Sequence, residues 1–553
     1  MVRNAAYSMA AIASLAGAGL LVRVAMVSVG SRDTKSLHEA VYSPYPKGLI
    51  PQDLESETNR VNAEIDRLKQ EAIAEWRALP KNSGTAMRQI QLLGKIEVFD
   101  KNLSVNHNQA CSFCHMPYTG FSGPISSLNA TTVAYPGSVR YRFGKRKPQG
   151  YTYSPYYPVV QYNQAQGDFY GGNFWDLRAT GYRLQSPDAE QAQGPPHDTQ
   201  EMGLPDTACV PYRISTGEYA HIFTSVWGAQ AFAIQWPKDI GRICNTPAAA
   251  FGTNASPLDL KPEDRGAADA AYDQYALSIT AYEASPDVSA FSSKFDAALA
   301  SPKKAVLSAD EQAGWDLFRG KAKCNTCHLE GTQNSFQESS RGSNGTTAAG
   351  NASGQAPLFT DFTSSNLGLP RNPNNPYYYQ DKPDAYGFIP NPLGSAFVDL
   401  GVGLFLRGKS GVTPNSDWAQ YANNFDGKMQ VSTLRNADMR PYPGFVKVYM
   451  HNGYLKSLKE VVHFYNTRDS YRVSGSCPAG AEKLTCWPPA EVSANMDTTI
   501  GNLGLSDKEE DQIVKFMQTL TDGYMRPYTD GNSFSGNPRT TGRTAGKGSV
   551  GRH

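Results

Sequence analysis

The sequence predicts a mainly α-helical protein with long irregular loops, and three observations support this fold class. Several segments begin with a helix-capping residue and then carry apolar residues at helical spacing. The 553-residue chain also contains 50 glycines and 36 prolines, which favour long loops around a modest amount of regular structure. The motif Cys-x-x-Cys-His occurs twice, at residues 111–115 and 324–328, so we expect one domain around each motif.

Each motif is typical of a covalent haem c site. The two thiols form thioether bonds to the haem vinyl groups, and the adjacent histidine becomes the proximal ligand of the iron. Paired cysteines also occur in zinc sites, but zinc takes four ligands and each motif supplies three. We therefore expect two covalently bound haem c groups in two c-type cytochrome-like haem domains. The predicted haem-binding residues are Cys111, Cys114, His115, Cys324, Cys327 and His328.

Helical patterns outline the organisation of the chain. The segment 55–79 carries apolar residues at helical spacing, and Ser308, Ser457 and Ser506 each precede a glutamate by three residues, as helix caps do. The segment 333–355 is rich in Ser, Gly, Asn and Thr and predicts a surface insertion. The predicted divisions are a signal peptide or N-terminal membrane anchor (1–30), an extension with a helix (31–84), a first haem domain (85–300), a second haem domain (301–530) and a disordered tail (531–553).

The N-terminal segment predicts export. An apolar run from Ala5 to Leu21 is intermediate in length between a signal-peptide core and a membrane span, so cleavage and retention as an anchor stay open. Both alternatives place the rest of the chain in the periplasm, where disulfides form. Four cysteines outside the motifs allow three pairings, of which Cys209–Cys244 with Cys477–Cys486 is the most local, or they are buried free thiols. A formal net charge of +1 indicates no nucleic-acid partner.

Further short segments accompany the two motifs in a fixed order. They are Leu93-Gly94-Lys95, Phe174-Trp175-Asp176-x-Arg178, Gln191-Ala192, Glu201-Met202-Gly203, Leu434-Arg435-Asn436 and Tyr449-Met450-His451-Asn452-Gly453. On these residues the chain resembles the bacterial dihaem cytochrome c peroxidase and MauG superfamily, over roughly Leu92 to Asp522. The resemblance implies an oxidoreductase that uses H2O2.

The resemblance makes the haem on His115 the one that meets peroxide. It implies that Gln191 and Glu201 form the distal pair above this haem, with Pro195 also in the pocket. A carboxylate in this position can move a proton from one oxygen of H2O2 to the other, so that water leaves. Glu201 would otherwise be an ordinary solvated carboxylate.

The resemblance makes the haem on His328 the electron-transfer haem. Trp175 is similar to the tryptophan that lies between the two haems and carries electrons, although Leu177 stands where glycine is usual. Alignment of the helix after Ser457 puts Tyr465 at the sixth iron position, where MauG-like members have tyrosine and many peroxidases have methionine. Trp175 and Tyr465 could instead be core aromatic residues.

Two departures from the family pattern bear on the chemistry. No histidine occurs between His115 and Trp175, which predicts an open first haem unless His197 serves as its ligand. Lys147 stands where the resemblance implies an asparagine that helps to bind an interhaem calcium ion. A charged lysine cannot bind calcium, so Ca2+ stays an alternative and not an expectation.

Three functions are compatible with these residues and motifs. The first is a peroxidase that reduces H2O2 with electrons from a small periplasmic donor, a cytochrome c or a cupredoxin. The second is a MauG-like oxidase that stores oxidising equivalents on both haems and oxidises a protein or organic substrate. The third is a dihaem electron carrier without catalysis, which would not need the distal pair Gln191 and Glu201.

Overall fold

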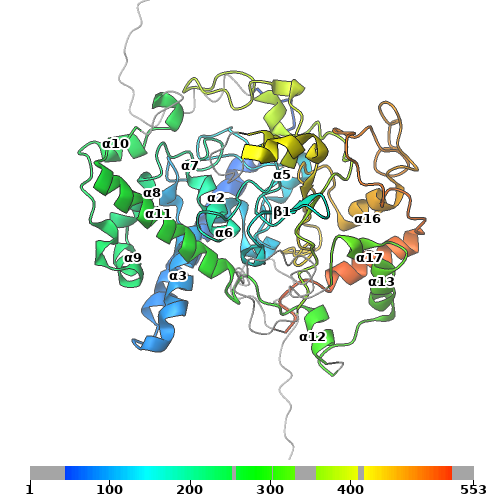
Figure 1. Ribbon diagram of the computed structural model, residues 1–553, viewed down its shortest axis with the longest axis horizontal. Coiled ribbons are helices and arrows are strands. Elements are labelled where there is room, and N and C mark those ends of the chain that lie inside the picture. The colour runs from blue at the N-terminus through cyan, green and yellow to red at the C-terminus, as the bar shows by residue number, and fades with distance from the viewer. Residues whose placement is uncertain (1–43, 252–256, 302, 331–355, 409–415, 526–553) are drawn as a thin grey trace, which may run out of the picture. The chain divides into compact units, whose positions relative to one another are not determined.

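Helices supply most of the regular structure in the computed structural model, which describes residues 44–251, 257–301, 303–330, 356–408 and 416–525 (Figure 1). This confirms the predicted mainly α fold with long loops. The α-helices are α2 (Leu54–Arg77), α3 (Ala86–Val98), α4 (Cys111–Cys114), α5 (Ser126–Thr131), α6 (Pro187–Ala192), α7 (Gly194–His197), α8 (Cys209–Ser215), α9 (Ala220–Trp227), α10 (Ile240–Cys244), α11 (Pro262–Glu283), α12 (Lys294–Ala300), α13 (Ala309–Arg319), α15 (Val402–Arg407), α16 (Leu458–Thr467) and α17 (Asp507–Gln518).

Strands are few and short in the described residues. β1 (Gln161–Asn163) pairs antiparallel with β2 (Asp168–Tyr170), and β3 (Ser364–Ser365) pairs antiparallel with β4 (Met429–Gln430). Two-residue and three-residue strands add little to a fold of this size, so long loops connect the helices.

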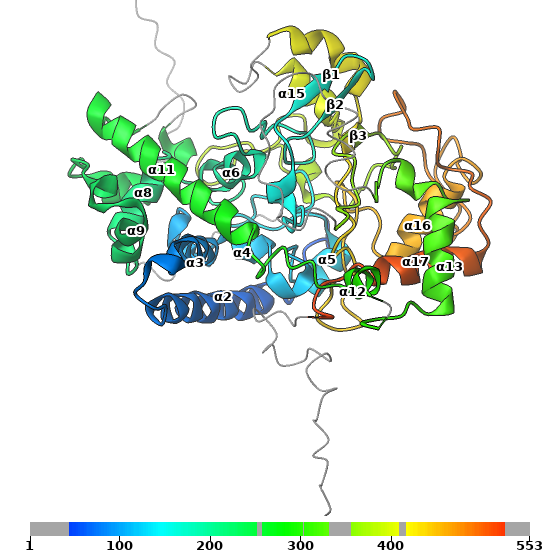
Figure 2. The ribbon, with the colours of Figure 1, turned by 60° about the horizontal axis from the view of Figure 1, so that its bottom comes forward.

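The predicted helix over 55–79 is confirmed as α2. Its apolar residues Val61, Ile65, Leu68 and Ile73 are all buried, and they form one face of the helix. α2 packs against α3 and α4, as Figure 2 shows. The extension that precedes the first motif is therefore part of the core around that motif.

The first motif is preceded by a helix that crosses a later helix at a glycine. α3 packs against α11, and a Cβ atom on Gly94 of α3 would lie 1.9 Å from the carbonyl oxygen of Ser278 of α11. No side chain fits at this point, so only glycine lets the two backbones approach so closely.

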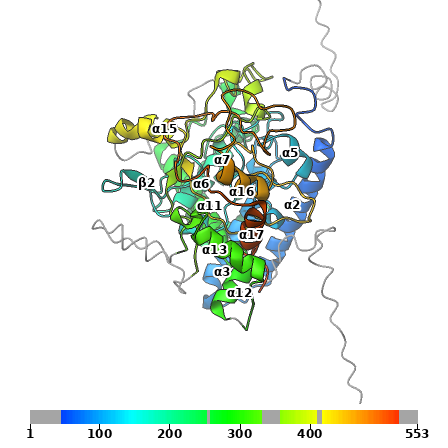
Figure 3. The same ribbon diagram turned by 90° about the vertical axis from the view of Figure 1, so that its right-hand side faces the viewer.

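The second motif has the same arrangement. α13 packs against α17, and a Cβ atom on Gly314 would lie 1.9 Å from the carbonyl oxygen of Gln512 (Figure 3). Each Cys-x-x-Cys-His motif thus follows a helix whose glycine contacts the backbone of a helix much later in the chain. The two motifs have similar helical surroundings, as the predicted pair of cytochrome-like domains requires.

The predicted helix caps are confirmed. Ser308 begins α13 and Ser506 begins α17, each in a reciprocal capping box with the glutamate three residues later. Ser457 caps α16 by accepting the backbone N–H of Glu460 at 3.1 Å. The Glu460 carboxylate instead accepts the backbone N–H of Lys456, so this cap is one-sided.

Apolar side chains form two main cores. The larger draws on residues from Tyr45 to Val288, with Val448 added, and the second on residues from Phe295 to Leu520. Phe295 lies in α12, so α12 packs with the residues that follow it. The exact domain boundary after residue 300 stays a prediction.

Of the alternatives left open for the four remaining cysteines, the structure has the most local pairing. Cys209 pairs with Cys244, and Cys477 pairs with Cys486. The predicted signal or anchor, the insertion at 333–355 and the tail from 531 lie outside the described residues. Within the part of the chain that the structure describes, no helix is both long and apolar enough to cross a membrane.

Candidate active site

The first motif presents a histidine whose ring is fixed for metal binding. Cys111 to Cys114 form the single turn of α4, and His115 follows directly. Nδ1 of His115 lies 3.1 Å from the carbonyl oxygen of Phe121. Because a carbonyl can only accept, Nδ1 carries the hydrogen and Nε2 keeps its lone pair for iron. Burial lowers the pKa of His115 to about 4, so the imidazole is neutral, as an iron ligand must be.

The second motif repeats this arrangement. Nδ1 of His328 lies 2.9 Å from the carbonyl oxygen of Phe359, and burial lowers the pKa of the ring. The four motif cysteines form no disulfide, whereas the other four cysteines are paired in two disulfides. Both motifs therefore offer two thiols and a neutral imidazole with its Nε2 free, the donor set that covalent haem attachment requires.

A largely apolar cavity opens beside the second motif. It is lined by Cys324, Cys327 and His328 and by side chains from three helices. The apolar helical side chains that line it are Phe318, Leu458, Val461, Val462, Ile513 and Met517. An apolar crevice next to two thiols and a free imidazole nitrogen fits a porphyrin.

Tyr465 lines the same cavity, on the face of α16 that also carries Val461 and Val462. Burial raises the pKa of the Tyr465 phenol, and the thiols of Cys327 and Cys324 raise it further. Tyr465 therefore lies at the cavity of the second motif with a neutral phenol.

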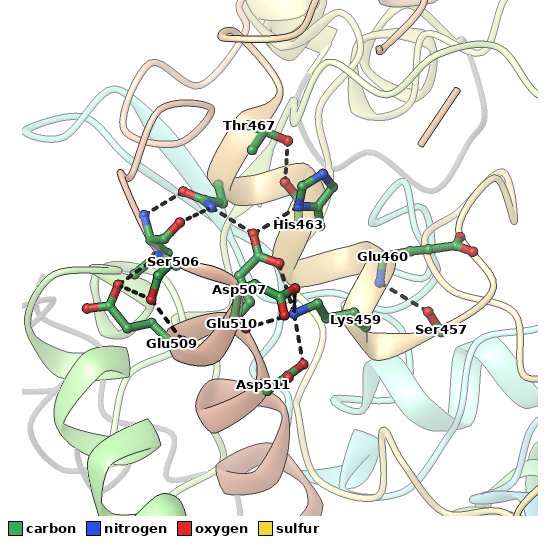
Figure 4. Close-up of polar contacts among 12 residues, drawn as sticks. Ser457, Lys459, Glu460, His463, Thr467, Ser506, Asp507, Glu509, Glu510 and Asp511 are labelled. Carbon is green, nitrogen blue, oxygen red and sulfur yellow. Dashed lines mark hydrogen bonds and ion pairs between the residues drawn. The ribbon is translucent and has the colours of Figure 1, made fainter. Parts of the chain in front are cut away.

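His463, two residues earlier on α16, lies elsewhere. Its Nδ1 is 2.9 Å from the Glu510 carboxylate of α17 (Figure 4). Its Nε2 is 2.8 Å from the carbonyl oxygen of Leu484. Both ring nitrogens are engaged, so His463 is not available to the second haem. Glu510 also accepts a hydrogen bond from Asn466, which fixes the contact between α16 and α17.

Glu201 lies near the thiols of the first motif. The pKa of Glu201 is raised to about 8, mainly by burial and to a smaller extent by the nearby Asp198, while Arg178 acts in the opposite direction. Its carboxylate also raises the pKa of the thiols of Cys111 and Cys114, which places it beside the first haem site. Among the described residues, the Glu201 carboxylate has no hydrogen bond or ion pair.

Gln191 and Pro195 lie on the two short helices before Glu201. Gln191 is in α6, and the carbonyl oxygen of Pro195 in α7 accepts the backbone N–H of Met202 at 3.1 Å. This hydrogen bond folds the chain back so that Glu201 follows α7 closely. Gln191 and Glu201 have no hydrogen bond to each other within the described part of the chain. His197 is exposed, and its Nδ1 lies 2.9 Å from the carbonyl oxygen of Leu204.

Trp175 lies beside the cavity of the second motif and close to Lys147. The Trp175 indole N–H donates to the carbonyl oxygen of Lys147 at 3.0 Å, and both residues line the cavity. The ammonium of Lys147 lowers the pKa of His115, so the positive charge of Lys147 acts on the first motif as well. Trp175 and Lys147 thus connect the surroundings of the two motifs.

The loop after Trp175 contains a strained backbone position at Leu177, where the sequence departs from the family pattern. Leu177, where glycine is usual, has a φ of 63°, a conformation that L-residues rarely adopt. Its side chain is fully buried in an apolar cluster with Val160 and Val402. Burial of this side chain offsets the backbone strain at this turn.

Three buried ionic side chains secure the same loop. Arg146 forms ion pairs with Asp176 and Asp399, each at 2.6 Å. Arg146 holds the pKa of both carboxyls well below their usual range. In the ranges that the structure describes, no group of three or more His, Cys, Asp or Glu residues could hold a metal ion, and calcium binding through other groups stays open.

Sequence reasoning missed one buried cluster near the first motif. Ser154, Asp188 and Glu283 come from three distant segments and meet between α6 and α11. No local pattern marks them, because each residue alone is typical of a helix end or a turn.

Two neutral-histidine sites, each beside two free thiols, on a helical fold define the class of protein: a dihaem c-type cytochrome. Comparisons with known proteins then narrow the family. Residues 88–304 match the family model of di-haem cytochrome c peroxidases. The methylamine utilization protein MauG of Paracoccus denitrificans is 26% identical over 438 residues, covering 79% of this chain and 89% of MauG.

Two further known proteins of the same kind are similar to this chain. The cytochrome-c peroxidase IdrP1 of Denitromonas iodatirespirans is 24% identical over 434 residues, covering 78% of this chain and 80% of IdrP1. The solved structure of the diheme peroxidase BthA from Burkholderia thailandensis has a TM-score of 0.53 at 23% identity, covering 79% of this chain and 86% of BthA. The chain is therefore similar to di-haem cytochrome c peroxidases over residues 88–304 and to MauG over 79% of its length, and it is an oxidoreductase with two covalently bound haem c groups.

Proposed function

We propose that the protein is a peroxidase that reduces H2O2 to water at the haem on His115. The observation that supports this most directly is the Glu201 carboxylate, which lies near the thiols of Cys111 and Cys114 without a counter-ion among the described residues. A half-buried carboxylate with a raised pKa and no ion pair is typical of a group with a chemical task.

Glu201 has the proton affinity that this task requires. When bound, the haem supplies the electron chemistry that splits the O–O bond. Glu201 accepts a proton from one oxygen of H2O2 and returns it to the other, so that the second oxygen leaves as water. A general acid–base group works best with a pKa near the operating pH, and the pKa of about 8 meets this condition. The Gln191 amide on α6 is proposed to orient the peroxide.

Electrons are proposed to enter through the haem on His328 and pass Trp175. Trp175 supports this path because it lines the cavity of the second motif, with its indole ring held by the Lys147 carbonyl. Tyr465 is proposed as the sixth ligand of the second iron, which would stabilise its oxidised states relative to methionine. The electron donor is proposed to be a small periplasmic cytochrome c or cupredoxin.

A MauG-like oxidase is the second candidate, in which both haems together store oxidising equivalents and withdraw electrons from a protein or organic substrate. Tyr465 in the cavity of the second motif favours it, as does the absence of histidine between His115 and Trp175. The electron-carrier alternative is less well supported, because a carrier has no use for Glu201.

A steady-state assay of the purified holoprotein distinguishes the candidates. With H2O2, a peroxidase oxidises reduced cytochrome c or a cupredoxin rapidly, whereas an oxidase turns over faster with organic or protein substrates. The ferric protein should also show one high-spin and one low-spin haem by EPR, because no histidine is expected to close the first site. Two low-spin signals without peroxide turnover would support the carrier instead.

A further inference from the structure

Ser154, Asp188 and Glu283 form a hydrogen-bonded cluster inside the first haem domain. The Ser154 hydroxyl lies 2.5 Å from Oδ1 of Asp188 and 3.3 Å from Oε2 of Glu283. The Asn173 side-chain amide donates to the same Asp188 oxygen at 3.3 Å. Asp188 is only 1% exposed and Glu283 only 2% exposed. Two carboxyl groups are therefore gathered around one hydroxyl, away from water.

Counting hydrogens shows that the cluster holds an extra proton. The Ser154 hydroxyl also lies 2.6 Å from the carbonyl oxygen of Tyr151, which can only accept. A serine hydroxyl has one hydrogen and cannot donate both to this carbonyl and to Asp188. One of the two short contacts must use a hydrogen that belongs to a carboxyl group. No lysine or arginine forms an ion pair with Asp188 or Glu283 among the described residues, so a proton is what neutralises them.

The pKa shifts of the two carboxyl groups agree with the presence of an extra proton. Burial raises the pKa of Glu283 well above its usual range, and the neighbouring Asp188 raises it further. Burial also raises the pKa of Asp188, while its hydrogen bonds to Glu283 and Ser154 act in the opposite direction. Two carboxyl groups in contact titrate as a pair, and one proton stays bound where both would otherwise be ionised.

The cluster lies next to the first haem site. Asp188 is in α6, one helical turn before Gln191, and Glu283 is the last residue of α11. The same helix α11 contacts the first motif, because the phenol oxygen of Tyr275 lies 4.0 Å from Sγ of Cys111 in α4. The other titratable groups near Cys111 have no hydrogen bond to the cluster among the described residues; they are Glu97 of α3, Cys114 of α4, Tyr272 and Tyr275 of α11, and Glu201.

We propose that Asp188 and Glu283, joined through Ser154, form a proton store coupled to the oxidation state of the haem on His115. When this haem gains an electron, the cluster takes up a proton from solvent; when it loses the electron, the cluster releases the proton. The charge inside the domain then stays constant, which matters because uncompensated charge is costly in a buried site. The position of the cluster beside the first haem site does not depend on the proposed function. The role of the proton store in the reaction rests on that function, because reduction of H2O2 to two waters consumes two protons with two electrons.

Redox-induced infrared difference spectroscopy of the holoprotein tests the proposal at equilibrium, without turnover. We expect a C=O stretching band of a protonated carboxyl group that changes between the oxidised and reduced protein and shifts in D2O. The band should be lost in both Asp188→Asn and Glu283→Gln, because the two groups share the proton. Glu97→Gln and Glu201→Gln, which alter the other carboxyl groups near Cys111, should leave it in place.

Ser154→Ala extends the test to a variant that keeps both carboxyl groups and removes little volume. The band should then move, because its carboxyl group loses the hydroxyl partner. A band that persists unchanged in all three variants, or that is lost only with Glu97→Gln or Glu201→Gln, overturns the proposal. A holoprotein that shows the band but no peroxide turnover would retract the proposed function and keep the proton store.

Discussion

The indole N–H of Trp175 donates to the backbone carbonyl of Lys147, and the ammonium group of the same lysine lies 5.7 Å from the centre of the Trp175 ring. One residue therefore fixes the ring and places a positive charge beside it. A cation at this distance favours the neutral ring over an oxidised one. Lys147 thus opposes electron withdrawal from Trp175.

The variant Lys147→Met should lower the reduction potential of the first haem, because a positive charge nearby favours the reduced state. Burial lowers the pKa of Lys147 to about 8, so its charge is present below this pH and lost above it. The difference between wild type and variant should therefore be largest at acidic pH and vanish at alkaline pH. Spectroelectrochemical titration across this range measures it. Lys382→Met, at an exposed lysine, is the matched control and should change nothing.

The rate of the reaction with H2O2 should rise with pH and level off above about 8, because only ionised Glu201 can accept a proton. Glu201→Gln should reduce turnover by about 100-fold or more and remove this pH dependence. Asp198→Asn should move the midpoint to lower pH, because it removes a negative neighbour. Arg178→Gln should move it to higher pH. Stopped-flow kinetics of the four proteins provides the measurement, and midpoints that do not move in opposite directions would remove Glu201 from the mechanism.

Tyr465→Phe should change the absorption and EPR spectra of the haem on His328, because the iron loses its proposed sixth ligand. His463→Gln is the control on the same helix, and it should leave those spectra as they are, since both nitrogens of His463 are engaged by Glu510 and Leu484. Identical spectra for Tyr465→Phe and wild type would show that another group, or none, completes the second iron site.

Gly94→Ala should destabilise the protein by about 1–3 kcal/mol, because the new methyl group would overlap the Ser278 carbonyl oxygen. The control is Gly266→Ala on α11, where a Cβ atom would meet nothing within 4 Å. There, alanine should stabilise the helix by roughly 0.5–1 kcal/mol. Thermal unfolding of the two variants should therefore shift in opposite directions.

Features set by neighbouring residues could be predicted from the sequence. The caps at Ser308, Ser457 and Ser506 follow from a serine and a glutamate three residues apart, and the haem motifs follow from five consecutive residues. Both disulfides were the most local of the possible pairings. Short-range chemistry was sufficient in each case.

Features that depend on distant segments could not be predicted. Ser154, Asp188 and Glu283 meet only because η4 (Ser154–Tyr156), α6 and α11 pack together, and no periodicity brings them together. The sequence showed Lys147 only as a departure from the family pattern, whereas the structure places its charge beside Trp175. The roles of Glu201, Gln191, Trp175 and Tyr465 stay predictions, because packing alone does not test chemistry.

The glycine crossings also bear on how the holoprotein matures. Each motif stands before the helix that completes its crossing, with Ser278 and Gln512 both far downstream of their thiols. Because the chain emerges with its N-terminus first, Cys111 and Cys114 become available for haem attachment before α11 can pack on α3. The second motif has the same order relative to α17. Covalent loading can thus precede closure at both sites, and no finished crevice has to reopen for its cofactor to enter.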